Sequence, residues 1–215
     1  MVKRVTVTPA RRHRFGLGGG IQSGVVTRGD SEPISVPLWD LHLKAQYENR
    51  NMLGGLRRLR LEERPRMIIQ EPFPSFDRPR FGNVLSAELR QPGFLEARTT
   101  LVAGAEHEFG PDPFDTFFRH RVDGRLSVER NFWQHRIFAS FGWRASFYRV
   151  PSDELTNAGE APPADYDLMY LEQVVRLDLR DDPNRPHAGF FMQLRAQEAG
   201  FFLRSSWDYV RLTPD

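Results

Sequence analysis

The chain of 215 residues contains no cysteine, and its only lysines are Lys3 and Lys44. Without cysteine it has no disulfide and no thiolate metal site. No stretch approaches the roughly 18 apolar residues of a membrane-spanning helix, which excludes a helical membrane protein. The first residues also lack the apolar segment of a signal peptide. These absences leave a soluble protein or a membrane β-barrel, whose strands give only a weak alternating signal.

The charge is nearly balanced, with 30 basic and 28 acidic residues and a net charge of +2. This balance gives no reason to expect a nucleic-acid partner. Almost all the basic residues are arginine, whose permanent charge and several donors suit a crowded polar interior that also holds Asp and Glu. A biased genome base composition would produce the same excess. The hydrophobic fraction of 40% argues against disorder.

Alternation of apolar and polar residues recurs along the whole chain, whereas helical periodicity is almost absent. The clearest example begins at Leu171, where apolar and charged residues alternate as far as Arg180. A turn rich in Asp, Pro and Gly follows, and the alternation resumes from Phe190 to Ala196. Successive side chains of a strand point to opposite faces, so each strand has one apolar face and one charged face. The segment predicts a β-hairpin.

The same pattern predicts about ten strands of roughly 8–12 residues. Short and long connections alternate between them, which is typical of a transmembrane β-barrel. The short connections are expected near 49–55, 93–96, 131–135 and 182–189, and the long ones near 24–37, 64–81, 109–116 and 151–167. Aromatic residues near the expected strand ends favour the same architecture, although a soluble sandwich could use them as end plugs: Phe132, Trp133, Phe147, Tyr148, Tyr166, Tyr170, Phe201, Phe202, Trp207 and Tyr209.

The charged positions of the expected strands all fall on one face. They are Arg58, Arg60, Glu88, Arg90, Arg125, Glu129, Arg144, Arg176, Asp178, Arg180 and Arg195. In a soluble sandwich this face would meet water, and in a wide barrel it would line a polar lumen. Periodicity alone leaves both alternatives open.

Four segments resemble parts of one family, in the same order and with the same spacing. Residues 15–24 (FGLGGGIQSG) are similar to a Gly-rich first strand, and residues 85–94 (LSAELRQPGF) to a fourth strand that ends in a Pro-aromatic turn. Residues 47–55 (YENRNMLGG) and 177–190 (LDLRDDPNRPHAGF) are similar to two of its turns. The turn residues that match are Asn51, Leu53, Gly54, Asp178, Arg180, Asp181, Pro183, Pro186 and Gly189. On these motifs the chain resembles the barrel region of the outer-membrane assembly-barrel superfamily, the BamA/TamA-like bacterial surface-antigen family.

The resemblance implies an all-β, antiparallel up-and-down transmembrane β-barrel in the bacterial outer membrane. About ten strands of a probable sixteen would lie in residues 13–215. Residues 1–12 would be a linker or the tail of a preceding periplasmic repeat, with at most Val5 to Thr8 belonging to that repeat. The family's Arg-Gly-aromatic lid motif is not found, because Arg28-Gly29 is followed by Asp30. The chain therefore resembles a fragment of such a barrel.

Members of this family insert or export polypeptides without a cofactor, so no cofactor is expected. The resemblance implies three kinds of partner: the lipid bilayer, unfolded outer-membrane or exported polypeptides, and periplasmic repeats or accessory proteins. A weakly paired edge strand can template an incoming strand. The expected lateral-gate strand is Phe15, Gly16, Leu17, Gly18, Gly19, Gly20 and Ile21. The alternative is that these glycines face a lumen too crowded for larger residues.

Other chemistry finds little support. Glu106, His107 and Glu108, with Asp112 and Asp115, have metal-ligand types, but His107 would point away from its two neighbours. The acidic turn after Asp178 is better explained by side-chain to backbone hydrogen bonds. No nucleophile elbow or phosphate loop is present, and an enzyme is not expected. The remaining alternatives are a passive outer-membrane pore, a structural surface barrel without insertase activity, and a soluble all-β binding module.

Overall fold

The computed structural model describes residues 11–28, 34–70, 79–111, 118–151, 165–182 and 184–214. Its ten antiparallel strands form one sheet in chain order, so the predicted all-β, up-and-down topology is confirmed. The described residues contain no α-helix, only the single turns η1 (Trp133–His135) and η2 (Phe201–Leu203). The strands are β1 (His13–Arg28), β2 (Ile34–Asn49), β3 (Arg58–Gln70), β4 (Arg80–Pro92), β5 (Thr99–Pro111), β6 (Phe118–Phe132), β7 (Ile137–Arg149), β8 (Tyr166–Asp178), β9 (Phe191–Ala199) and β10 (Tyr209–Pro214).

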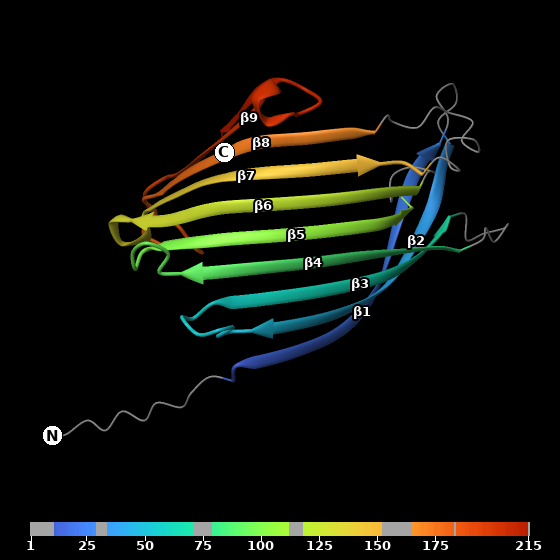
Figure 1. Cartoon of the computed structure of the whole chain (residues 1–215), viewed down its shortest axis with the longest axis horizontal. Helices are drawn as coiled ribbons and strands as arrows, with labels where there is room; N and C mark the ends of the chain where they lie inside the picture. The colour runs from blue at the N-terminus through green and yellow to red at the C-terminus, as the bar shows by residue number, and fades with distance from the viewer. Residues whose placement is uncertain are drawn as a thin grey trace.

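The sheet is curved and, within the described residues, it is not closed. β1 pairs only with β2, and β10 pairs only with β9. β1 and β2 bend away from the plane of β3 to β8, so the sheet forms a trough (Figure 1). The described residues include no helix long and apolar enough to cross a membrane.

The connections β2–β3, β4–β5, β6–β7 and β8–β9 gather at one end of the strands, which we name the turn end (left in Figure 1). The predicted bounds of two loops, 24–37 and 64–81, are too wide, because prolines that indicated loops lie inside strands. Val25 of β1 pairs with Pro37 of β2, which leaves only residues 29–33 between these strands. Pro65 lies in β3 and pairs with Asn83. The predicted separation of short from long connections therefore fails for β1–β2.

Pro65 interrupts the pairing of β2 and β3. Proline has no N–H to donate to a ladder. The register of β2 and β3 passes from His42↔Arg66 to Ala45↔Glu63, with no paired residues between them. The ladder therefore opens at two consecutive residue pairs and then continues in the same register.

The register places the predicted charged residues on one face. Arg60, Glu88, Gly104, Arg125 and Arg144 lie side by side in one row across β3 to β7. The other members of the predicted set occupy the same face by alternation, except Arg180, which follows the end of β8 and pairs with Asp178. The prediction of a single charged face is confirmed for the strand residues.

Large apolar side chains are exposed on one face of the sheet, and a few charged side chains are buried on the other. On the apolar face, Leu126 is 49% and Phe141 55% exposed. On the charged face, Glu108 is only 5% exposed, and Val102 is 1% exposed. Soluble proteins bury large apolar side chains and leave carboxylates in water. Here the most buried carboxylate lies on the charged face, while several large apolar side chains are exposed on the other.

The aromatic residues are divided between the two faces. Phe132 ends β6 and Trp133 lies in the following turn, as predicted. Tyr170, in contrast, lies well inside β8 and lines the charged face beside Arg144. Tyr148 stacks on Tyr166 on that face, at 4.7 Å between ring centroids. Tyr148 and Tyr166 lie at strand ends, as predicted, whereas Tyr170 does not, and all three point to the charged face.

Candidate functional site

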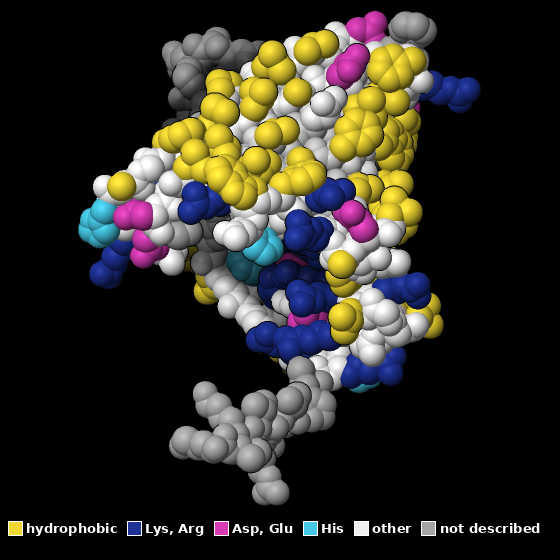
Figure 2. All heavy atoms as spheres, turned by 90° about the vertical axis from the view of Figure 1, so that its left-hand side faces the viewer, with side chains coloured by type: hydrophobic (Ala, Val, Ile, Leu, Met, Phe, Trp, Pro, Cys, Tyr) yellow, Lys and Arg dark blue, Asp and Glu magenta, His cyan; other side chains and the backbone are white. Residues whose placement is uncertain are grey.

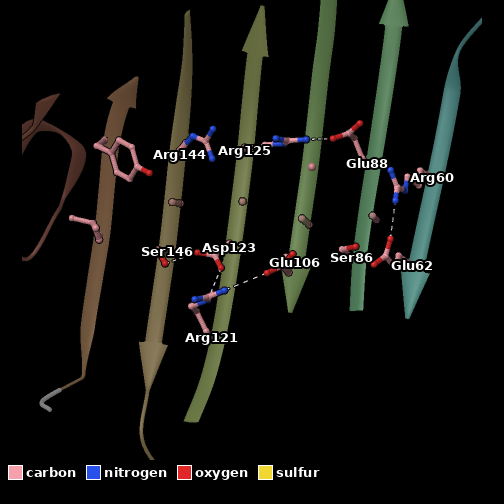
Figure 3. A pocket seen from close by; sticks show the side chains of 17 residues that line it. Arg60, Glu62, Ser86, Glu88, Glu106, Arg121, Asp123, Arg125, Arg144 and Ser146 are labelled. Atoms are coloured by element: carbon pink, nitrogen blue, oxygen red, sulfur yellow. Dashed lines mark hydrogen bonds and ion pairs between the residues drawn. The ribbon is translucent and has the colours of Figure 1, made fainter. Parts of the chain in front are cut away.

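The charged face is hollowed. Viewed along the strands from the turn end, Lys, Arg, Asp and Glu side chains gather in a hollow, while hydrophobic side chains cover the outer surface above it (Figure 2). The hollow contains a cavity of about 510 Å³ lined by residues of β3 to β8 (Figure 3). This cavity is the candidate site on the charged face.

Two neighbouring rows of residues form its wall. We name them the Arg125 row (Arg60, Glu88, Gly104, Arg125, Arg144) and the Asp123 row (Glu62, Ser86, Glu106, Asp123, Ser146). The Asp123 row carries carboxylates and hydroxyls but no cation, whereas the Arg125 row is mainly basic. An acidic row therefore lies directly beside a mainly basic one.

Each carboxylate of the Asp123 row has a cationic partner. Glu62 accepts from Lys44 Nζ at 2.8 Å and from Arg60 Nη2 at 2.9 Å. Arg121 bridges Glu106 at 3.3 Å and Asp123 at 2.7 Å. The Ser146 hydroxyl donates to Asp123 at 2.5 Å. The wall therefore consists of separate groups of charges, each with fixed partners (Figure 3).

Two glycines let arginines pair across an intervening strand. Arg125 of β6 passes over Gly104 of β5 and pairs with Glu88 of β4. A Cβ on Gly104 would lie 2.9 Å from Arg125 Nε. Arg66 of β3 passes over Gly82 of β4 in the same way, and a Cβ on Gly82 would lie 2.8 Å from the Phe109 backbone oxygen and 3.2 Å from Arg66 Nε. Glycine is required here for space, because a side chain would occupy the path of the guanidinium.

The most buried charges lie deeper along the strands. Glu108 pairs with Arg66 at 2.7 Å, with Arg119 at 3.1 Å and with Arg121 at 3.1 Å. Burial of a charge is tolerated only when partners replace its water. The sequence offered Glu108 only as a candidate metal ligand and gave no sign of this cluster, because its three arginines come from β3 and β6.

The metal-ligand set is not assembled. His107 points to the apolar face, where its ring lies 6.1 Å from that of His120, while Glu106 and Glu108 point to the charged face. Asp112 and Asp115 lie outside the described residues. Within the described part of the chain, no group of three or more ligand residues could hold a metal ion.

The expected lateral-gate strand is the edge of the sheet. Among the described residues β1 pairs with β2 alone, and Leu17 is 90% exposed on its apolar face. Of the glycines, Gly18 has open space at the Cβ position, and Gly16 meets only Gln46 at 3.8 Å. Gly20 is the exception on the charged face, with His42 Nε2 at 2.9 Å, while Gly19 meets Leu43 at 3.2 Å on the other face. A crowded lumen therefore explains Gly20 but not Gly16 or Gly18.

The predicted β2–β3 turn is confirmed as a turn. Asn51 Oδ1 accepts from the backbone N–H of Leu56 at 3.1 Å, and its carbonyl accepts from Gly54 at 3.4 Å. Gly54 has φ 80°, which glycine adopts readily. Leu53 has φ 54°, in the left-handed region that leucine rarely adopts.

The β8–β9 turn is also a structural turn. Arg180 donates to both oxygens of Asp178, at 2.8 and 2.7 Å. Asp181 Oδ1 accepts from the backbone N–H groups of Ala188 at 3.1 Å, His187 at 3.0 Å and Asp182 at 2.9 Å, and these bonds lower the pKa of its carboxyl. Gly189 has φ 98°, and a Cβ there would lie 2.1 Å from the Leu179 oxygen. Pro186 is exposed, and Pro183 lies outside the described residues.

Comparison with known proteins identifies no relative. No protein family, no curated protein and no solved structure matches this chain.

Proposed function

We propose that the chain forms part of an outer-membrane β-barrel that inserts or exports polypeptides. The apolar face would contact lipid, the charged face would surround a water-filled lumen, and the ten strands would belong to a barrel of about sixteen. The observation that carries this proposal is a sheet with large exposed apolar side chains on its outer face and paired charges on its hollow face.

The height of the apolar band supports a membrane. On the outer face of β6, Val122, Gly124, Leu126 and Val128 lie between His120 and Arg130. Ten residues of strand span about 34 Å, at about 3.4 Å per residue. With a strand tilt of about 40°, this corresponds to a vertical height of about 26 Å, close to the apolar band of about 25 Å in outer-membrane barrels. In a soluble sandwich this face would pack against a second layer, and the described residues form only one.

The edge strand supports a role in polypeptide handling. β1 is long, exposed on its apolar face and without a second neighbour among the described residues. An unpaired strand edge can accept an incoming strand through backbone hydrogen bonds. In hydrocarbon an unpaired backbone is costly, which drives such an edge to find a partner.

Membrane insertion is tested by detergent dependence. We expect the purified chain to need detergent or a bilayer, and to migrate differently on a gel before and after heating. A chain that stays monomeric and folded in buffer without detergent would contradict the barrel and support a soluble binding module.

The edge is tested by disulfide trapping. Because the chain has no cysteine, a Gly18→Cys variant carries a single thiol at a site with open space. In a complete barrel protein that contains this chain, an unfolded outer-membrane client bearing one cysteine should form an adduct with it. Gly124→Cys is the matched control, because Gly124 also has open space but lies in β6, which is paired on both sides. No adduct at Gly18, or equal adducts at both sites, would overturn the role of β1.

A passive pore is the second candidate, because the charged hollow would suit a water-filled channel. The same trapping experiment separates the two. A pore would conduct ions in the complete barrel protein without capturing a client strand at Gly18.

A further inference from the structure

The turns at the turn end expose large apolar residues at their tips. Leu53 and Leu56 lie in the β2–β3 turn, Leu95 in the β4–β5 turn and Trp133 in the β6–β7 turn. Their side chains are between 58% and 89% exposed. Three separate turns therefore present the same kind of side chain at one end of the sheet.

The backbone at these tips is unfavourable for the residues that occupy it. The φ angles are 54° at Leu53, 58° at Leu56, 66° at Leu95 and 43° at Trp133. Glycine or asparagine is usual in this left-handed region, because it lacks a bulky Cβ substituent. Neither the φ angle nor exposure to water favours leucine or tryptophan here. Such a combination indicates that the side chains have a binding role.

Arginines accompany the tips. The guanidinium of Arg136 lies over the Trp133 ring at 5.4 Å, and that of Arg130 lies over the Phe132 ring at 4.6 Å. Arg130 also pairs with Glu96 of the β4–β5 turn, whereas Arg136 is exposed and has no carboxylate partner among the described residues. Arg130 marks the end of the apolar band on β6, so the tips lie just beyond that band. Apolar tips next to arginine match the boundary between lipid tails and anionic headgroups.

We propose that Leu53, Leu56, Leu95, Trp133, Arg130 and Arg136 form an interfacial rim that binds the phosphate headgroups of anionic phospholipid. The tips enter the interface of the leaflet next to the turn end, and Arg136 holds a lipid phosphate. Continuity with the outer apolar face and the positive charge beside the tips favour lipid over a protein partner. The inference rests on the proposed membrane location and adds to it a lipid class, a leaflet and a set of residues.

The test uses single-tryptophan variants of the full chain in bilayers. Trp39, Trp143 and Trp207 are changed to Phe, which leaves Trp133 as the reporter. Quenching by brominated phosphatidylglycerol is compared with quenching by brominated phosphatidylcholine at equal mole fraction. We expect stronger quenching by phosphatidylglycerol, and Arg136→Gln should weaken this preference about five-fold, the effect of one basic residue near an anionic surface. Arg204→Gln is the matched control, since Arg204 is exposed with φ 57° and lies in the β9–β10 connection.

A second reporter separates the two proposals. A variant that retains only Trp143 reports the middle of the apolar band, and bromines deep in the acyl chains should quench it. If Trp143 is quenched and Trp133 is not, the membrane location stands and the lipid-binding rim is refuted. In that case, iodide quenching of Trp133 would indicate a rim in water, and protection from iodide would indicate a protein cover. Equal quenching of Trp133 by both lipids refutes the anionic preference, and no quenching of Trp143 refutes the membrane location itself.

Discussion

Gly104→Val should break the ion pair between Arg125 and Glu88 without touching either charge. The new Cβ would lie 2.9 Å from Arg125 Nε and 3.1 Å from its Cγ, so the guanidinium must leave its path across β5. Loss of a half-exposed ion pair costs up to about 1 kcal/mol. Crowding by the added methyl groups costs about 1–3 kcal/mol. We therefore expect a loss of about 1–4 kcal/mol in the free energy of unfolding.

Urea titration of the chain in lipid vesicles, followed by tryptophan fluorescence, measures this loss. Gly124→Val is the matched control: the same substitution one strand away, on the apolar face, where no atom lies within 4 Å of the new Cβ. In lipid it should change stability little, because the added methyl groups meet acyl chains.

A double-mutant cycle isolates the cause. Gly104→Val in an Arg125→Ala background should cost at least about 1 kcal/mol less than in the original chain, because the side chain that it displaces is gone. The reasoning is refuted if the two backgrounds give the same cost, or if Gly104→Val costs no more than Gly124→Val. Either result would mean that Gly104 is present for a reason other than the path of Arg125.

Three further predictions follow from the charges and the sheet edges. Glu108→Gln leaves Arg66 and Arg119 without their buried carboxylate and should cost about 3–5 kcal/mol in the same titration. Glu129→Gln, in a more exposed pair with Arg90, should cost about 1 kcal/mol or less. Equal costs would contradict a special role for burial. The pKa of Asp181 lies below its usual value near 3.9, because backbone N–H groups of the folded turn donate to its carboxylate. The stability that the ionised carboxylate gives the turn is full above about pH 4 and is lost as the pH falls through the lowered pKa. Hydrogen exchange at the Ala188 amide should therefore accelerate in that range, and an unchanged profile in Asp181→Asn would rule this cause out. Finally, the isolated chain should give no stable single-channel conductance, because its sheet is open at β1 and β10; steady channels from the chain alone would show that it closes.

The alternation of apolar and polar residues was sufficient to predict the strands and to say which side chains share a face. The alternation from Ile137 to Phe147 and from Leu171 to Leu177 predicted β7 and β8, and the register confirms that Arg144 and Arg176 share a face. Alternation predicts the faces because successive side chains of a strand point to opposite sides of the sheet, whichever strand is its neighbour. The turn after Asp178 was predictable for a similar reason, since Asp181 bonds to backbone groups only a few residues away.

Proline was the main source of error in the strand boundaries. Pro37 and Pro65 indicated loops, yet both lie in paired strands. Proline removes one donor but leaves the extended backbone intact, so a neighbouring strand can pair around it. Only the partner strand decides whether the ladder continues, and the partner is distant in sequence.

Local sequence is enough to specify a meander of strands that each have one apolar and one charged face, because side-chain alternation and turn chemistry act over a few residues. Burial, contacts between strands and the location of the turns depend on the tertiary structure. Curvature turned the charged face inward, which buried Glu108 and left Leu126 exposed. Pairing in register placed Gly82 and Gly104 in the paths of Arg66 and Arg125, and it brought three turn tips to one end of the sheet. These features depend on which strands become neighbours and how the sheet bends, and both are set by contacts between residues far apart in the chain.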